Sequence, residues 1–172
     1  MRLVLDSIQL RLVELDDAEY IYHLRSAPNL NQHLSATSGG VEKQRRWLVD
    51  YKQDEADRKQ FYFIIQRLNG TPCGTVRLYD FRDDSFCWGS WILDQSKTLS
   101  AALESAVLVY RFGFNELGFC KSHFDVRKEN KAVIKFHKRF GAVQTDEDRD
   151  NYYFELDKNS VSEAIQRFGF EL

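Results

Sequence analysis

Few side chains in this sequence combine acid–base chemistry with a place beside apolar residues, and these are the candidates for proton transfer. His137 recurs with Val133 and Phe140 at three- and four-residue steps, so its imidazole lies on the apolar face of a helix. There it either donates a proton near neutral pH or packs as a core residue. The candidates for a general base are Glu14, Asp80, Asp94 and His123, and each equally fits a surface or turn position.

A second chemical stretch is the polar turn Gln95–Ala101, which precedes a long apolar segment. The backbone N–H groups at a helix N-terminus bind anions, and Lys97, Thr98 and Ser100 add a charge and two hydroxyls. The turn has no glycine, so its backbone is less free to approach a phosphate group. The alternative interpretation is a polar loop that caps the following helix.

The segment Phe119–Ala142 must position His137. It is predicted to be a strand at Ser122–Val126, a charged turn, and a helix that ends at Gly141, where a positive φ is favoured. Asn130 stands at the start of this helix, where it either caps the helix or contacts a ligand.

The remaining elements follow from apolar periodicity and turn signals. The other predicted strands are Ile8–Leu15, Phe61–Arg67, Cys73–Asp80, Phe86–Leu93, and Ala142–Thr145 paired with Tyr152–Leu156. The other predicted helices are one capped by Asp16-Asp17 that runs to Arg25, Val41–Asp57, Ala101–Leu117, and Ser160–Phe168. The segment Asn29–Gly40 is predicted to be a loop, and it either carries part of a functional site or only connects two helices.

Local signals add detail to these elements. Asn69-Gly70 predicts a two-residue hairpin turn, and Gly89 with Ser90 predicts a bulge or a close backbone approach. Ser160 and Glu163 have the spacing of a capping box. The apolar stripe of the longest helix is predicted to comprise Leu103, Val107, Tyr110 and Phe114, widened by Ala102, Ala106 and Val109.

Bulk properties limit the function. A chain of 172 residues with 14% aromatic residues predicts one packed domain, and a net charge of −2 argues against nucleic-acid binding. Cys73, Cys87 and Cys120 form no CxxC pair, which argues against a zinc site and a disulfide framework and fits a reducing cytosol. The sequence shows no signal peptide and no apolar segment of about 20 residues, so we expect a soluble, cytoplasmic protein without a membrane partner.

The run Asp125-Val126-Arg127, with Asn130, Phe136-His137 and Phe140-Gly141-Ala142, resembles a conserved segment of the Gcn5-related N-acetyltransferases, the GNAT superfamily. The resemblance covers roughly Leu10–Leu156 and is greatest to members that act on ribosomal proteins, spermidine or nucleotide-linked amino sugars. It implies an α/β (α+β) fold over residues 1–172 as a single domain. The sheet is mixed, mostly antiparallel, with six to seven strands and helices on both faces.

The resemblance also implies the reaction, which is direct attack of a primary amine on acetyl-CoA without a metal. The favoured acceptor is a small molecule such as a nucleotide-linked amino sugar, and a protein or peptide N-terminus is the alternative. Because the expected glycines are missing from Gln95–Ala101, a non-catalytic acyl-CoA-binding module stays open as a second class. A homodimer is compatible with this reading.

Site residues follow from the same resemblance, by position. His137 stands where many family members place the Tyr that protonates the leaving thiolate. The predicted catalytic residues are His137 in this role and the base candidates Glu14 and Asp94. In the family, the strand that matches Phe86–Leu93 bulges and parts from its neighbour to admit pantetheine. The predicted coenzyme-binding residues are Trp91, Ile92, Leu93, Lys97, Thr98, Leu99, Ser100, Ala101 and Asn130.

Overall fold

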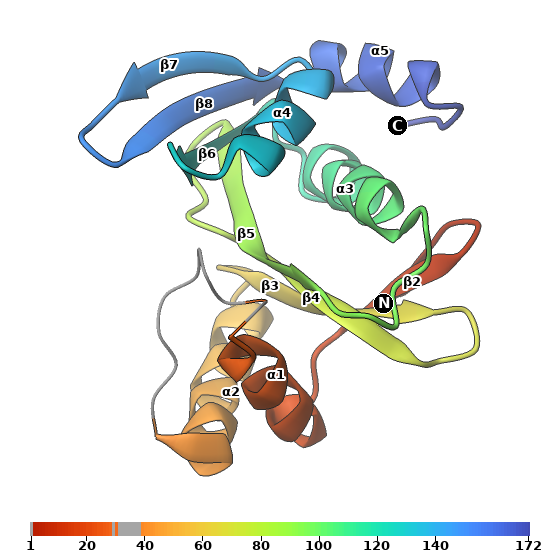
Figure 1. Cartoon of the computed structure of the whole chain (residues 1–172), viewed down its shortest axis with the longest axis vertical. Helices are drawn as coiled ribbons and strands as arrows, with labels where there is room; N and C mark the ends of the chain where they lie inside the picture. Colours follow the sequence, from red (N-terminus) through yellow and green to blue (C-terminus); the bar gives the residue numbers. More distant parts are fainter. Residues whose placement is uncertain (1, 29, 31–38) are drawn as a thin grey trace. The chain divides into compact units, whose positions relative to one another are not determined.

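The computed structural model describes residues 2–28, 30 and 39–172 (Figure 1). Most of the predicted loop Asn29–Gly40 lies outside these residues. The residue contacts group into two compact units, the first comprising Met1–Tyr79 with Gly89–Leu108 and the second Asp80–Trp88 with Val109–Leu172. The prediction of a single domain over residues 1–172 stays a prediction.

Among the described residues, eight strands form the sheet in the order β1-β2-β3-β4-β5-β6-β8-β7. They are β1 (Arg2–Val4), β2 (Ile8–Leu12), β3 (Phe61–Arg67), β4 (Pro72–Tyr79), β5 (Ser85–Leu93), β6 (Lys121–Arg127), β7 (Val143–Glu147) and β8 (Asn151–Asp157). β5 and β6 run parallel, and the pairs β1–β2, β2–β3, β3–β4, β6–β8 and β7–β8 run antiparallel. The predicted mixed, mostly antiparallel sheet is confirmed.

The strand count exceeds the predicted six to seven because β1 was not predicted. β1 has three residues, which is too short for an alternating pattern to be recognised, and it is held by pairing with β2. The β3–β4 hairpin at Asn69-Gly70 is confirmed, but its loop is longer than two residues. Arg67 N donates to Thr71 O at 2.9 Å, and Gly70 has a φ of +89°.

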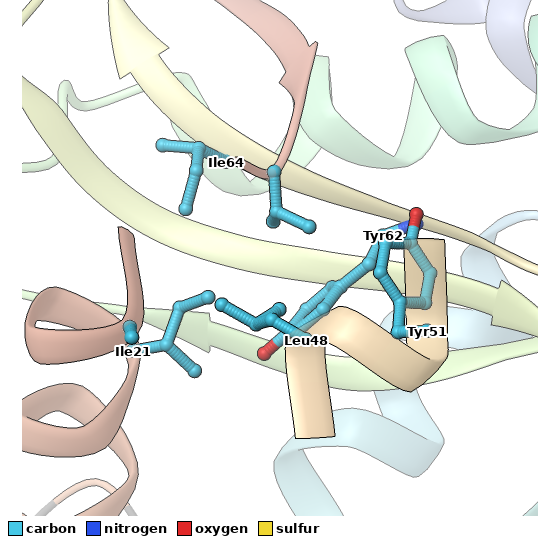
Figure 2. Packing of buried hydrophobic residues seen from close by; sticks show 7 residues of the cluster. Ile21, Leu48, Tyr51, Tyr62 and Ile64 are labelled. Atoms are coloured by element: carbon cyan, nitrogen blue, oxygen red, sulfur yellow. The ribbon is translucent and has the colours of Figure 1, made fainter. Parts of the chain in front are cut away.

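In the first unit, α1 (Ala18–Ser26) and α2 (Gly40–Ala56) pack on one face of β3 (Figure 2). Leu48 and Tyr51 from α2 meet Tyr62 from β3, and all three are at least 98% buried. The Tyr51 hydroxyl accepts from Tyr62 N at 2.6 Å, so the cluster has a satisfied polar atom inside it. The members of the cluster are Val13, Ala18, Ile21, Leu48, Tyr51, Tyr62 and Ile64.

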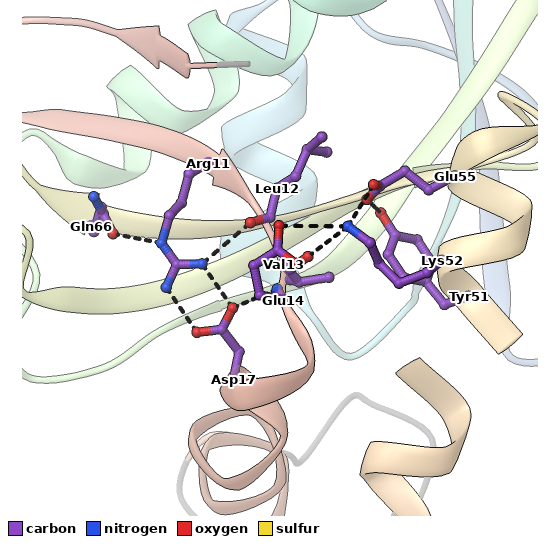
Figure 3. A network of polar contacts seen from close by, with 9 residues as sticks. All are labelled: Arg11, Leu12, Val13, Glu14, Asp17, Tyr51, Lys52, Glu55 and Gln66. Atoms are coloured by element: carbon purple, nitrogen blue, oxygen red, sulfur yellow. Dashed lines mark hydrogen bonds and ion pairs between the residues drawn. The ribbon is translucent and has the colours of Figure 1, made fainter. Parts of the chain in front are cut away.

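The start of α1 differs from its prediction. A 3-10 turn (η1, Leu15–Asp17) precedes α1, and Asp17 does not cap α1 with its side chain. Its carboxylate instead accepts from Arg11 at 2.7 and 2.8 Å and from Glu14 N at 2.8 Å (Figure 3). The predicted cap is wrong because the Arg11 guanidinium, a stronger charge-assisted partner, takes the carboxylate.

The helix predicted at Ala101–Leu117 is α3 (Ala101–Arg111) followed by a π-helical turn (Phe112–Glu116). Its predicted stripe is partly wrong, because Leu103 is only half-buried whereas Glu104 and Ser105 are buried. In the second unit, a Cβ on Gly113 would lie 2.3 Å from the Phe86 ring, so glycine gives this ring its space.

The second unit also holds α4 (Lys131–Arg139) and α5 (Lys158–Arg167) beside the β6–β8–β7 sheet. The predicted end of α4 is confirmed, since Gly141 has a φ of +94°. The predicted capping box at Ser160 is wrong, because α5 begins earlier and Asp157 caps it by accepting from Ser160 N at 2.9 Å. The Asp157 carboxylate also accepts from the Ser160 hydroxyl at 2.8 Å, so Ser160 is a donor to the cap and not the cap itself.

Candidate active site

Two parallel strands separate early in the second unit. β5 and β6 pair through Ser85↔Lys121 and Phe86↔Ser122. β6 continues to Arg127 and pairs with β8 along its whole length, whereas its pairing with β5 ends before Cys87 and His123. Strands that part in this way leave backbone groups for another partner.

In the first unit, β5 departs from regular geometry at the place predicted from Gly89 and Ser90. Ser90 has a φ of +47°, which is rare for a residue other than glycine. Its carbonyl accepts from the Thr75 hydroxyl at 3.0 Å, which stabilises this conformation. A Cβ on Gly89 would lie 2.9 Å from the Tyr79 hydroxyl, so a protein side chain already approaches this glycine.

After β5, Asp94 organises the turn that leads to α3. One carboxylate oxygen accepts from Ser96 N at 2.7 Å, and the other accepts from the Tyr20 hydroxyl at 2.9 Å. Burial and this hydrogen bond raise the pKa of Tyr20, so the phenol stays protonated and donates. Both oxygens of the predicted base therefore have a partner, and the catalytic role of Asp94 stays a prediction.

The glycine-poor turn needs no glycine for its own conformation. Among the described residues other than glycine, a positive φ occurs only at Arg58, Asp80 and Ser90, so Gln95–Ser100 has none. The turn therefore presents its backbone without strain, and the first turn of α3 leaves N–H groups without helical acceptors. This geometry accounts for the absent glycines and keeps an anion site at Lys97–Ala101 feasible.

The hydroxyls predicted for phosphate contact already have protein partners. Thr98 Oγ1 lies 2.7 Å from Ser7 Oγ, and Ser100 Oγ lies 3.0 Å from the same atom and donates to Glu104. Lys97 and Leu99 are exposed. Lys97 N and Ala101 N also donate within the turn, to Asp94 O at 3.2 Å and to Thr98 O at 3.3 Å. The turn therefore offers a ligand the amides of residues 98–100 and the Lys97 ammonium more readily than its hydroxyls.

Sequence reasoning missed the buried carboxylate of Glu104, which is 1% exposed. It accepts from Ser7 N at 2.9 Å, Ile8 N at 3.2 Å and the Ser7 hydroxyl at 2.7 Å. Burial alone would raise the pKa of Glu104, but the bonds from Ser100 and Ser7 hold it below its ordinary value. The available signal was an acid inside an otherwise apolar helical run.

His137 is 5% exposed, and its ring lies 4.1 Å from that of Phe124 and 5.1 Å from that of Trp88, centroid to centroid. Its Nδ1 atom has no hydrogen-bond partner among the residues that the structure describes. Burial lowers the pKa of His137 to about 3, so the ring is neutral at pH 7. A neutral imidazole is a poor proton donor to a thiolate, and the predicted catalytic role stays a prediction.

We expect His137→Ala to lower the melting temperature and to leave turnover per folded molecule intact, because the ring mainly fills space. Because the unfolded chain takes up a proton below pH 6.5 and the folded chain does not, His137 reduces stability as pH falls from 6.5 towards about 3. The slope is about 1.4 kcal/mol per pH unit, and His137→Phe should remove it. Urea unfolding between pH 4 and 8 measures this pH dependence of stability. If His137→Ala instead loses turnover while coenzyme binding is unchanged, His137 is the acid that protonates the thiolate.

Two further predicted site residues, Glu14 and Asn130, have other contacts. Glu14 has a side chain that is 67% exposed, and its carboxylate lies 3.7 Å from the Lys52 ammonium (Figure 3). Asn130 Oδ1 accepts from Val133 N at 3.3 Å, which confirms that Asn130 caps α4. Roles for Glu14 as a base and for Asn130 in coenzyme binding stay predictions.

Comparison with known proteins identifies the class. A family model described as the acetyltransferase (GNAT) domain matches residues 7–143. A solved structure described as apo FdhC, a nucleotide-linked sugar GNAT, is 44% identical to this chain and superimposes with a TM-score of 0.92. The match covers 100% of this chain and 98% of the FdhC chain. The chain belongs to the GNAT acetyltransferase family.

Two further proteins are similar to this chain at lower identity. Acetyltransferase PseH of Campylobacter jejuni is 23% identical over 149 residues, which cover 87% of this chain and 90% of that protein. A solved ribosomal-protein-S5-alanine acetyltransferase from Vibrio fischeri is 17% identical to this chain, with a TM-score of 0.80. The match covers 92% of this chain and 97% of that protein's chain. The latter likeness shows the fold alone. Within the described part of the chain, no helix has the length and apolar character needed to cross a bilayer.

Proposed function

We propose that this protein transfers the acetyl group of acetyl-CoA to the amino group of a nucleotide-linked sugar. The observation that carries the proposal is the 44% identity, over the whole chain, to a protein described as a nucleotide-linked sugar GNAT. At this identity and coverage the arrangement of the site is expected to be shared, whereas the fold alone would leave the acceptor open.

For the coenzyme, the first unit supplies two groups. The backbone of Trp91–Leu93 follows the kink at Ser90 and is proposed to pair with the pantetheine arm. The amides of Lys97–Ala101, at the start of α3, are proposed to bind the diphosphate, with the Lys97 ammonium adding charge. Acetyl-CoA supplies the activated thioester, and the amine carries out the attack.

Free-thiol release from acetyl-CoA tests the acceptor, measured over nucleotide-linked amino sugars, free amino sugars, spermidine and peptides with free N-termini. We expect turnover only with the nucleotide-linked sugars, confirmed by a product heavier by one acetyl group. Turnover confined to peptides would overturn the proposal in favour of an N-terminal acetyltransferase. Acetyl-CoA binding by calorimetry without turnover on any amine would indicate a non-catalytic acyl-CoA-binding module.

Lys97→Ala tests the diphosphate site. We expect the KM for acetyl-CoA to rise about three- to tenfold, because removal of one exposed phosphate contact costs roughly 1 kcal/mol. The KM for the amine should not change, and the wild-type advantage should shrink at high salt. The matched control is Lys59→Ala, which removes an exposed lysine that pairs with Asp57 at 2.9 Å at the end of α2. Equal effects in both variants would exclude a specific site at Lys97.

A further inference from the structure

Three side chains of the second unit form a hydrogen-bonded chain that the proposed function has not used. His123 Nε2 lies 3.0 Å from Asp80 Oδ2, and His123 Nδ1 lies 3.0 Å from Ser85 Oγ. His123 is 8% exposed and Ser85 is 7% exposed. The hydrogen bond from His123 lowers the pKa of Asp80, which keeps this carboxylate ionised.

The roles of the ring nitrogens follow from the partners. An ionised carboxylate only accepts hydrogen bonds, so Nε2 carries the proton and donates it to Asp80. In the neutral ring Nδ1 is then an acceptor, and the Ser85 hydroxyl donates to it. Nδ1 is thus a basic nitrogen, and Asp80 is placed to stabilise the imidazolium that forms when Nδ1 takes up a proton.

The backbone conformation of Asp80 indicates that its contact with His123 is formed at a cost in conformational energy. Asp80 has a φ of +49°, one of three positive values among the described residues other than glycine. Such conformations cost about 1 kcal/mol or more and occur often at functional sites. The conformation lets Asp80 face both His123 and Arg82, whose guanidinium lies 2.8 Å away.

The position of Ser85, His123 and Asp80 indicates what these three residues could do. Ser85 belongs to the first of the two β5–β6 pairs, and His123 follows directly after the second, Phe86↔Ser122. The three residues therefore lie where the two parallel strands begin to part within the second unit. In an acetyltransferase, the amine must lose a proton before it attacks the thioester, and a positioned base accelerates this step.

We propose that Ser85, His123 and Asp80 form a proton relay that deprotonates the amine acceptor; this proposal rests on the proposed function. The ammonium of the acceptor gives one proton, directly or through one water, to Ser85 Oγ, which passes its own proton to His123 Nδ1. The free amine then attacks the thioester carbon, a C–N bond forms and the C–S bond breaks. The coenzyme thiolate takes the second proton from the nitrogen, and His123 returns the first proton to solvent.

Several charged groups face this relay and set its pH dependence. Arg82 contacts Asp80, and Glu155 of β8 stands opposite His123 in the sheet register. Lys121, two residues before His123, lies 3.3 Å from Asp84. Of these charged groups, the Asp80 carboxylate is the one that accepts a hydrogen bond directly from the ring.

His123→Gln is the decisive variant, because glutamine retains hydrogen bonding but cannot take up a proton. We expect kcat/KM for the amine to fall about 100-fold near neutral pH, with acetyl-CoA binding unchanged by calorimetry. Activity should recover above the pKa of the acceptor amine, where the amine is already deprotonated. Asp80→Asn, which suits a left-handed backbone, removes the carboxylate that accepts from His123 Nε2 and should also lower kcat/KM for the amine near neutral pH.

Ser122→Ala and His23→Gln are the matched controls. Ser122 is a fully buried serine of β6 whose hydroxyl has no partner among the described residues, and the His23 side chain is 67% exposed. Both variants should keep the wild-type pH profile. The relay is overturned if folded His123→Gln, checked by its melting curve, keeps wild-type kcat/KM at every pH, or if its loss is independent of pH. Absence of turnover in the wild-type chain would instead count against the proposed function.

Discussion

Replacement of Gly74 with alanine is expected to destabilise the protein by about 3 kcal/mol and to weaken acetyl-CoA binding. A Cβ at this position would lie 2.2 Å from Ile92 O and 2.9 Å from a Leu93 methyl carbon. A backbone carbonyl cannot rotate away as a side chain can, so β4 and β5 must separate locally. The displaced residues include two that are proposed to hold the pantetheine arm.

Urea unfolding measures the first effect and calorimetry with acetyl-CoA the second. Gly70→Ala is the matched control, because a Cβ at Gly70 meets no atom within 4 Å although its φ is +89°. We expect this control to lose only about 1 kcal/mol, from backbone strain, and to bind acetyl-CoA normally. A Gly74→Ala variant with the wild-type urea midpoint would contradict the packing of β4 on β5 described above.

Glu104→Leu should have an effect of similar size for a different reason. The leucine would leave two backbone N–H groups, of Ser7 and Ile8, and two hydroxyls without their acceptor in a place that is buried at Ile8 and partly buried at the serines. Each unsatisfied buried group costs about 1–3 kcal/mol, and relaxation recovers part of the sum, so we expect a loss of about 3–5 kcal/mol. Thermal and urea unfolding would measure this loss.

Glu104→Gln separates charge from shape. It keeps one acceptor oxygen, so the loss at pH 7 should be smaller than for leucine. Because hydrogen bonds hold the pKa of Glu104 below its ordinary value, its stabilising effect is present above about pH 4.5 and is lost as the pH falls further. The wild type should lose this part of its stability in acid and Glu104→Gln should not. Identical acid unfolding of both proteins would refute the role of the charge.

Predictions from local patterns succeeded where a short segment determines its own structure. The helix end at Gly141, the irregular backbone at Gly89-Ser90 and the Asn130 cap each depend on residues within one turn of the position concerned. The central strand β3 was also evident from the sequence, because it begins with the apolar run Phe61–Ile65, and such runs are typical of buried strands. In the structure, six of its seven residues are buried.

Predictions failed where a distant residue decides the outcome. Glu104 bonds to Ser7, 97 residues away, and His123 bonds to Asp80, 43 residues away. No pattern within a helix or strand indicates such a pair. The sequence also could not show that the hydroxyls of Thr98 and Ser100 already contact Ser7 and Glu104. The role of Thr98 and Ser100 in coenzyme binding stays a prediction.

The π-helical turn at Phe112–Glu116 carries one more residue per turn than the α-helix before it. Because an α-helix needs only about 3.6 residues per turn, deletion of one residue here would restore regular winding and change which side chains of this stretch face their present neighbours. Gly113 would then turn away from the Phe86 ring for which it makes space. The length of this stretch is therefore constrained as tightly as its composition, and a relative that lacks one residue would need a smaller side chain in place of Phe86.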